Sequence, residues 1–161
     1  MLSVIWVVFS GLFFAAAVID ARSYRIPNWI PLALAALFAV AVALSGKTIV
    51  DYWPSFALGA GMMAIGYGLY AVTGMGAGDA KLAAAAVMWA GLAGLYAWVF
   101  ALAMSMAALA VALIVLRRVA PAGQAAKARV LQRGAPVPLG IALAAASILA
   151  SWRFDAALWT F

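Results

Sequence analysis

The 161-residue chain contains no cysteine and no histidine, and because its four acidic residues are all aspartates it contains no glutamate either. Without cysteine there is no disulfide, no thiolate nucleophile and no cysteine zinc site, and the redox compartment cannot be inferred. Without histidine, serine–histidine–aspartate triads and histidine-based zinc-protease sites are excluded. Any acid–base chemistry by carboxylates must therefore use Asp20, Asp51, Asp79 or Asp155.

Charged residues are also scarce, at 9% of the chain, whereas apolar residues make up 70%. A water-soluble domain of this size cannot hide so much apolar surface in one core, so we predict an all-α integral membrane protein in contact with the lipid bilayer. The net charge of +6 raises the possibility of nucleic-acid binding. The lysines and arginines are scattered between long apolar runs, however, so we interpret them as topology signals and expect no nucleic-acid partner.

Apolar runs divide the chain into predicted transmembrane helices, each of which needs about 20 residues to cross a bilayer. The apolar stretch from Leu82 to Leu116 is too long for one span, and we divide it at Gly91 and Gly94. Six spans result, within a single membrane-embedded domain covering residues 1–161. They lie at about 2–19, 29–44, 54–73, 80–90, 95–116 and 137–152.

Two local patterns add detail to the second and third spans. Asn28 directly precedes the second span, where an asparagine is well placed to cap the helix. In the third span Ala60, Ala64 and Gly68 recur at every fourth residue, a spacing that lets neighbouring helices approach closely in lipid. We therefore predict a capped second helix and a close helix contact along these three residues.

The basic residues orient the six predicted spans, because lysine and arginine tend to stay on the cytoplasmic side. Alternate loops, including the basic loop 117–134, carry eight of them, and the opposite side carries only Lys47 and Arg153. This distribution predicts that both termini are non-cytoplasmic and that Asp20 and Asp79 are cytoplasmic. The eight are Arg22, Arg25, Lys81, Arg117, Arg118, Lys127, Arg129 and Arg133.

Asp20 and Asp79 are the aspartates whose surroundings suggest chemistry. Acidic groups at membrane depth are costly and by default indicate function. Two carboxyl groups brought close together cannot both ionise easily, and a charged and a protonated carboxyl can activate water and polarise an amide. Gly76 and Gly78 precede Asp79, and as glycines they can adopt conformations barred to other residues and let a substrate backbone approach. We therefore predict peptide hydrolysis by Asp20 and Asp79.

Each of these features also has a structural interpretation. Asp79 alone is a good helix N-cap, Asp20 alone is an acceptable boundary residue, and Lys81 alone is a topology charge. Two other classes of function also remain open. One is a small transporter or channel component in which intramembrane aspartates relay protons. The other is a serine–lysine membrane protease built on Ser23 and Lys81.

The motifs around the two aspartates resemble those of the type IV prepilin peptidases, membrane aspartyl proteases with a Gly-x-Gly-Asp motif. That motif is Gly76-Ala77-Gly78-Asp79 here, followed by Lys81. The first family aspartate usually precedes an Ile-Pro-Asn element, which matches Asp20 followed by Ile26, Pro27 and Asn28. Pro138-Leu139-Gly140-Ile141-Ala142 is similar to a third family element, with leucine in place of an aromatic residue.

The resemblance implies a multi-pass protein of the bacterial inner membrane that removes the short cytoplasmic leader of prepilins and pseudopilins. Asp20 and Asp79 would be catalytic, and Gly76, Gly78, Lys81, Pro27 and Asn28 would form the loops of the substrate site. Larger family members add a cysteine zinc domain associated with N-methylation. This chain is similar to the short, peptidase-only form that serves Flp or Tad pili, so we expect no methyltransferase activity, metal or other cofactor. We expect the substrate helix to dock against the third span.

Overall fold

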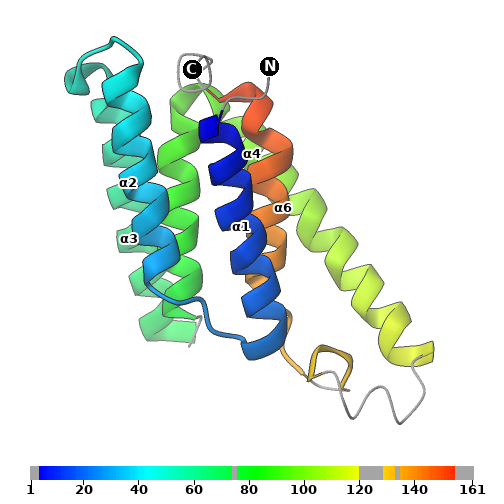
Figure 1. Cartoon of the computed structure of the whole chain (residues 1–161). Coiled ribbons are helices and arrows are strands. Elements are labelled where there is room, and N and C mark those ends of the chain that lie inside the picture. The colour runs from blue at the N-terminus through cyan, green and yellow to red at the C-terminus, as the bar shows by residue number, and fades with distance from the viewer. Residues whose placement is uncertain (1–3, 74–75, 120–128, 133–134, 155–161) are drawn as a thin grey trace.

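The computed structural model describes residues 4–73, 76–119, 129–132 and 135–154, and this part of the chain is a bundle of helices without strands (Figure 1). The all-α prediction is therefore confirmed for these residues. Short 3-10 helices occupy Ile49–Tyr52 (η1), Arg129–Leu131 (η2) and Ser151–Arg153 (η3). The α-helices are α1 (Val4–Ser23), α2 (Trp29–Leu44), α3 (Trp53–Thr73), α4 (Ala77–Val119) and α6 (Leu139–Ala150).

Three helical segments in the described part are long and apolar enough to cross a membrane. They are Val4–Ser23, Ile49–Thr73 and Ala77–Val119, and the helices Trp29–Leu44 and Leu139–Arg153 are apolar but shorter. Many large apolar side chains are exposed on the outside of the bundle, as expected where lipid is the solvent. The polytopic membrane architecture fits these helices, whereas the count of six spans and the orientation of the termini stay predictions.

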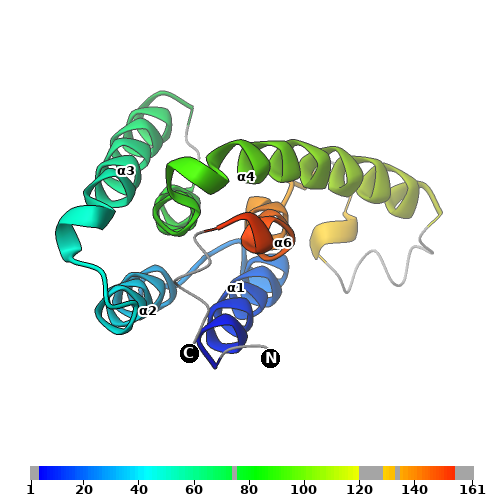
Figure 2. The same cartoon turned by 90° about the horizontal axis from the view of Figure 1, so that it is seen from above.

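The long helix α4 changes direction at Gly91, one of the two glycines at which the sequence predicts a division. Gly91 has φ 57° and ψ −173°, a conformation that lies outside the helical region and favours glycine. Residues 82–90 are all buried, whereas most residues of 92–119 are at least partly exposed. Figure 2 shows the part before Gly91 nearly end-on among the other helices and the part after it extending away across the view.

Aromatic side chains pack around the buried part of α4. The ring of Trp89 lies 5.0 Å from that of Phe9 on α1 and 5.2 Å from that of Phe38 on α2, measured between centroids. The Trp89 indole N–H also donates a hydrogen bond of 3.0 Å to the backbone oxygen of Leu34. Buried tryptophans usually satisfy their N–H in this way, and this one joins α4 to both α1 and α2.

Glycines bring α3 against α4, although not the residues that the spacing indicates. A Cβ atom built on Gly66 would lie 2.5 Å from the Cβ of Ala80, and one on Gly59 would lie 3.1 Å from that of Met88. Ala60, Ala64 and Gly68 are all exposed instead. The residues of α3 that pack against α4 therefore differ from the predicted ones, whereas docking of a substrate helix on this span stays a prediction. Nearly every side of α3 is apolar, so its sequence carries no polar face to indicate which side packs.

The ends of α1 and α2 also differ from the sequence prediction. The first predicted span stops before Asp20, but α1 continues to Ser23, so Asp20 lies inside its last turn. Asn28 occupies the N-cap position of α2, as predicted, but its side chain makes no capping hydrogen bond to that helix. Trp6 near the start of α1 donates a hydrogen bond of 2.9 Å to Ser151 after α6, so these two points share one end of the bundle.

Candidate active site

Asp20 and Asp79 lie at the other end of the bundle. Asp20 is in the last turn of α1 and Asp79 in the first turn of α4, and both turns are at the lower end in Figure 1. The two carboxyl groups therefore lie at the same end of the bundle. Asp51, in contrast, is exposed in η1, where its Oδ2 accepts a hydrogen bond of 2.8 Å from the backbone N–H of Thr48. Asp155 lies outside the described residues.

Asp20 is held in place by the start of α6. Only 4% of the residue is exposed, and its Oδ2 accepts a hydrogen bond of 2.8 Å from the backbone N–H of Gly140. The first N–H groups of a helix have no partner within the helix, so this donor is available for a side chain. A Cβ atom on Gly140 would lie 2.9 Å from both Cβ and Oδ2 of Asp20. The absence of a side chain at Gly140 therefore makes room for this carboxylate.

Asp79 is partly exposed and lies against Gly76. The backbone oxygen of Gly76 accepts hydrogen bonds from the N–H groups of Asp79 and Ala80, at 3.0 and 3.3 Å, which begins α4. A Cβ atom on Gly76 would lie 2.7 Å from Oδ2 of Asp79. Within the part of the chain that the structure describes, no hydrogen bond reaches the Asp79 carboxylate. Its oxygens are therefore open to a ligand.

Gly78 packs against the connection between α1 and α2. A Cβ atom there would lie 3.0 Å from the Cβ of Ile26 and 3.1 Å from its backbone oxygen. The prediction that Gly76 and Gly78 use a glycine-only conformation was wrong, because the only glycines with positive φ among the described residues are Gly46 and Gly91. The two glycines of the motif matter through their small size instead.

A side-chain hydrogen bond joins the Gly-x-Gly-Asp segment to the Ile-Pro-Asn element. The Lys81 ammonium donates to Oδ1 of Asn28 over 2.8 Å, across 53 positions of sequence. Pro27 precedes α2 directly before Asn28, and its backbone oxygen accepts a 3.2 Å hydrogen bond from Ile30. The structure thus brings Lys81 and Asn28 together beside the start of α4, and it explains why the Asn28 side chain makes no capping hydrogen bond to its own helix.

A second network fixes the segment that leads into α6. The Tyr24 hydroxyl and Nη2 of Arg117 both donate to the backbone oxygen of Pro136, at 3.3 and 3.2 Å. Nε of Arg117 also donates to the backbone oxygen of Val130 over 3.0 Å. Tyr24 has φ 52°, a left-handed conformation that a residue other than glycine adopts only under constraint. These bonds hold Pro136 four residues before Gly140, and so support the donor to Asp20.

The serine–lysine alternative finds no support in the geometry. The Ser23 hydroxyl donates 2.8 Å to the backbone oxygen of Ile19 in its own helix, and 3.3 Å to that of Arg25. Lys81 is bound to Asn28. A serine nucleophile needs a base within hydrogen-bond reach, and the structure gives Ser23 backbone acceptors in that place.

Sequence reasoning missed two residues of this site. The sequence indicates Gly140 only as part of a motif, and its partner Asp20 is 120 positions away. The sequence indicates Arg117 only as a topology charge, whereas its guanidinium also binds backbone oxygens of the loop before α6. The local signal for Gly140 was the Pro138–Ala142 element, which follows a basic loop and opens an apolar helix.

The arrangement brings together two carboxylates, one fixed and one accessible, at the end of an apolar bundle. Such a pair can share a proton and place a water molecule between its oxygens, which is the chemistry of amide hydrolysis by aspartates. No group of three or more aspartate, glutamate, histidine or cysteine side chains is close enough to hold a metal among the residues that the structure describes.

Comparison with known proteins places this geometry in a family. No curated protein and no solved structure matches the chain. The sequence profile of the type IV leader peptidase family, however, matches residues 7–115. That range covers more than half of the chain, and it contains both Asp20 and the Gly-x-Gly-Asp segment. The chain therefore belongs to the type IV leader peptidase family.

Proposed function

We propose that this leader peptidase is an aspartyl endopeptidase in which Asp20 and Asp79 act together on one peptide bond. The observation that carries the proposal is that the last turn of α1 and the first turn of α4, which hold Asp20 and Asp79, lie at the same end of the bundle, where Gly78 beside Asp79 packs against Ile26 after α1. Gly140 fixes Asp20, and the small size of Gly76 leaves room for Asp79.

In the proposed reaction a water molecule lies between the two carboxyl groups. The charged carboxylate removes a proton from this water as its oxygen attacks the peptide carbonyl carbon, and the protonated carboxyl donates a hydrogen bond to the carbonyl oxygen. The C–N bond then breaks, and the leaving nitrogen takes a proton from the pair. The products are a new carboxyl end and a new amino end, and the two aspartates return to their starting protonation.

The site is proposed to face the cytoplasm. Arg22, Arg25 and Arg117 lie at the same end of the described helices as Asp20 and Asp79, whereas Lys47 and Arg153 lie at the other end. Lysine and arginine remain preferentially on the cytoplasmic side of a membrane, which supports this orientation in a bacterial inner membrane. The proton-relay alternative would place aspartates near the middle of the bilayer, whereas both of these lie in terminal turns.

The expected substrates are prepilins and pseudopilins, whose short leader precedes an apolar membrane helix. The sequence resemblance favours the pilins of Flp or Tad systems, and residues 1–161 would act as a single membrane-embedded peptidase domain. The 161 residues contain no cysteine with which to build a cysteine zinc site, so we expect no N-methylation from them.

Leader removal in cells tests the proposal. A candidate Flp-type prepilin is co-expressed with the wild-type protein or with Asp20→Asn, Asp79→Asn or Asp51→Asn, and the pilin product is sized by mass spectrometry. Asp51→Asn is the matched control, since this carboxylate is exposed in η1 away from the other two. We expect mature pilin with wild type and Asp51→Asn and only precursor with the other two. Mature pilin in both Asp20→Asn and Asp79→Asn would overturn the mechanism.

A further inference from the structure

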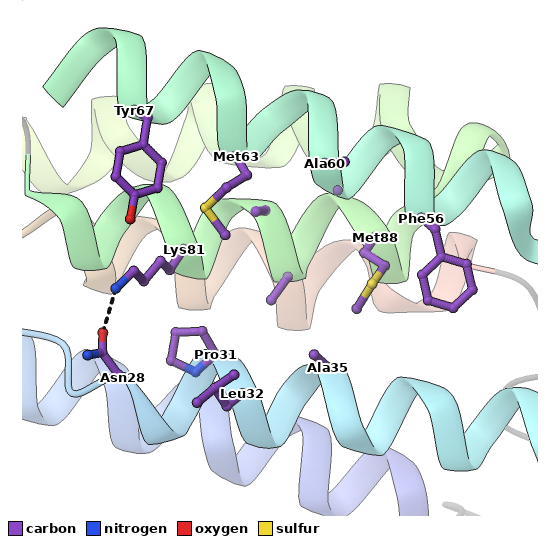
Figure 3. Close-up of a pocket in the computed structure, with 13 residues that line it drawn as sticks. Asn28, Pro31, Leu32, Ala35, Phe56, Ala60, Met63, Tyr67, Lys81 and Met88 are labelled. Atoms are coloured by element: carbon purple, nitrogen blue, oxygen red, sulfur yellow. Dashed lines mark hydrogen bonds between the residues drawn. The ribbon is translucent and has the colours of Figure 1, made fainter. Parts of the chain in front are cut away.

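An apolar groove runs along one side of the bundle, between α2 and α3, with α4 as its floor (Figure 3). Its volume is about 550 Å³. Figure 2 shows α2 and α3 standing apart, with the first part of α4 beside the gap, toward the middle of the bundle. One wall includes Leu32 and Ala35, the other includes Ala60 and Met63, and Ala85 lies on the floor.

The two ends of the groove differ in chemistry. At one end lie Asn28, Lys81 and Tyr67, which carry its polar groups, and the other end is closed by Phe56. The Phe56 ring stacks edge-on against buried Phe38, with 5.4 Å between ring centroids. Lys81 is two residues after Asp79 in the first turns of α4, so the polar end of the groove lies at the same end of the bundle as the proposed catalytic site. The groove therefore leads from lipid toward the end of the bundle that carries the aspartates.

The groove is deep because the residues at its base are small. Gly59 lets α3 approach α4 closely, and Ala84 and Ala85 follow on α4. Small residues at such a surface let the backbone of another helix come near in lipid. Met63 on α3 and Met88 on α4 also line the groove, and methionine side chains adapt to apolar partners of varied shape. These features suit an apolar helix.

A second groove of similar size offers a comparison. It occupies about 510 Å³ on the other side of α3, and includes Ile65, Leu92 and Trp98 in its lining. None of the described residues that line it is charged. Lipid chains can cover both grooves equally well, but only the first has hydrogen-bond donors at the end next to Asp79. This difference favours a peptide, which has backbone carbonyls to satisfy, as the occupant of the first groove.

We propose that the groove between α2 and α3 receives the apolar helix of the substrate, so that the bond to be cut emerges at the polar end beside Asp79. The inference rests on the proposed function and deepens it. A peptide bond must leave its helix before cleavage, and the freed carbonyls at membrane depth need donors. The Lys81 ammonium and the Asn28 amide supply them. This placement refines the expected docking on α3, because Ala60 lines the groove whereas Ala64 does not.

Cross-linking tests the position of the substrate helix, and the chain's lack of cysteine makes single introduced cysteines specific. Met63→Cys and Ala35→Cys report on the proposed groove, and Ile65→Cys, on the same helix as Met63, reports on the second one. Each is combined with Asp79→Asn to retain the precursor, and a prepilin with one cysteine in its apolar helix is treated in membranes with a short bismaleimide. We expect Met63→Cys and Ala35→Cys to cross-link the pilin about tenfold more than Ile65→Cys.

Cleavage kinetics provide a second, independent readout. Ala60→Leu narrows the groove, and Ala64→Leu adds the same atoms at an exposed position one turn away that lines neither groove. We expect Ala60→Leu to raise KM about tenfold with kcat nearly unchanged, and Ala64→Leu to change KM less than about twofold, because only the first removes binding space.

The possible results distinguish failure of the proposed groove from failure of the proposed function. If Ile65→Cys cross-links the pilin as strongly as Met63→Cys and Ala35→Cys, or if none of the three cross-links it, the proposed groove is wrong. The proposed function then still stands, provided that the wild-type protein cleaves the prepilin. A cross-link through Met63→Cys between two peptidase copies in place of the pilin would also overturn the proposed groove. Failure of the wild-type protein to cleave the prepilin would contradict the proposed function itself, whatever the cross-links.

Discussion

Asp20 and Asp79 are the same residue type in opposite surroundings. Asp20 is buried, and one of its carboxylate oxygens accepts a hydrogen bond from the Gly140 N–H. Tyr24 and Arg117 hold the segment before Gly140 by hydrogen bonds to the backbone oxygen of Pro136. Asp79 is partly exposed in the first turn of α4, with the small Gly76 against its carboxylate. The contrast indicates that Asp20 is fixed and Asp79 is adaptable. The same Gly→Ala change beside each aspartate should therefore lower kcat by different amounts.

Among substitutions that leave both aspartates in place, the largest effect is expected beside the fixed aspartate. Gly140→Ala adds a methyl group whose carbon would lie 2.9 Å from Asp20 Cβ and 3.0 Å from Cγ, in a buried place where neither helix can yield easily. A catalytic group displaced by about 1 Å can lose about 100-fold in rate, so we expect kcat for leader cleavage to fall about that far. Circular dichroism should report a folded helical protein, and near wild-type cleavage would contradict the fixed position of Asp20.

A smaller effect is expected from the equivalent change at the adaptable aspartate. Gly76→Ala places a methyl carbon 2.7 Å from Asp79 Oδ2, the far end of a side chain that has room to turn away. Because a rotamer change relieves the contact, we expect kcat to fall only about tenfold, which corresponds to about 1.4 kcal/mol. Initial rates of both alanine variants should be measured together. If Gly76→Ala were the more damaging of the two, the comparison would be reversed.

Loss of the Arg117 hydrogen bonds before α6 should lower kcat less than a change in the direct contacts of Asp20 or Asp79. Arg117→Gln removes the guanidinium bonds to the backbone oxygens of Pro136 and Val130. With hydrogen bonds worth about 1 kcal/mol each, we expect kcat to fall about fivefold at unchanged KM, and Arg117→Lys to recover part of it. Arg118→Gln removes the same charge one position away and is the control. Equal losses in both glutamine variants would indicate a loop-charge effect and not positioning of Asp20.

The smallest effect on chemistry is expected far from both aspartates. Gly91→Ala forces an alanine into φ 57° and brings its Cβ to 3.0 Å from the Ser55 hydroxyl. With φ 57° and ψ −173°, this conformation costs residues other than glycine about 1–3 kcal/mol, so the free energy of unfolding should fall by about that amount. Thermal unfolding in detergent measures the loss, and kcat in the folded fraction should change less than about twofold. A large loss of kcat would mean that the bend in α4 also positions Asp79.

The sequence predicts best where a pattern is local. Apolar runs identify the helices, and the division near Gly91 follows from the length of one run and its glycines. The placement of Asp20 and Asp79 near helix ends follows in the same way, although α1 ends one turn later than expected.

Contacts between residues that are distant in the chain could not be predicted from the sequence. The Gly140 donor to Asp20 and the Lys81 bond to Asn28 form only when the helices have packed. Nearly every side of α3 is apolar, so the sequence pattern does not show that Gly59 and Gly66, and not Ala60, face α4. Membrane helices lose the polar face that guides such predictions in water.

The cooperation of the two aspartates is tested most directly by a double-mutant cycle on purified protein in liposomes. Initial rates of cleavage of a synthetic prepilin are measured for Asp20→Asn, Asp79→Asn and the doubly substituted protein. Groups that act as a unit are non-additive, so each single variant should lose at least about 1,000-fold, and the double variant should be no slower than either. A double variant slower by the product of the two single losses, or a single variant close to the wild-type rate, would contradict a shared catalytic site.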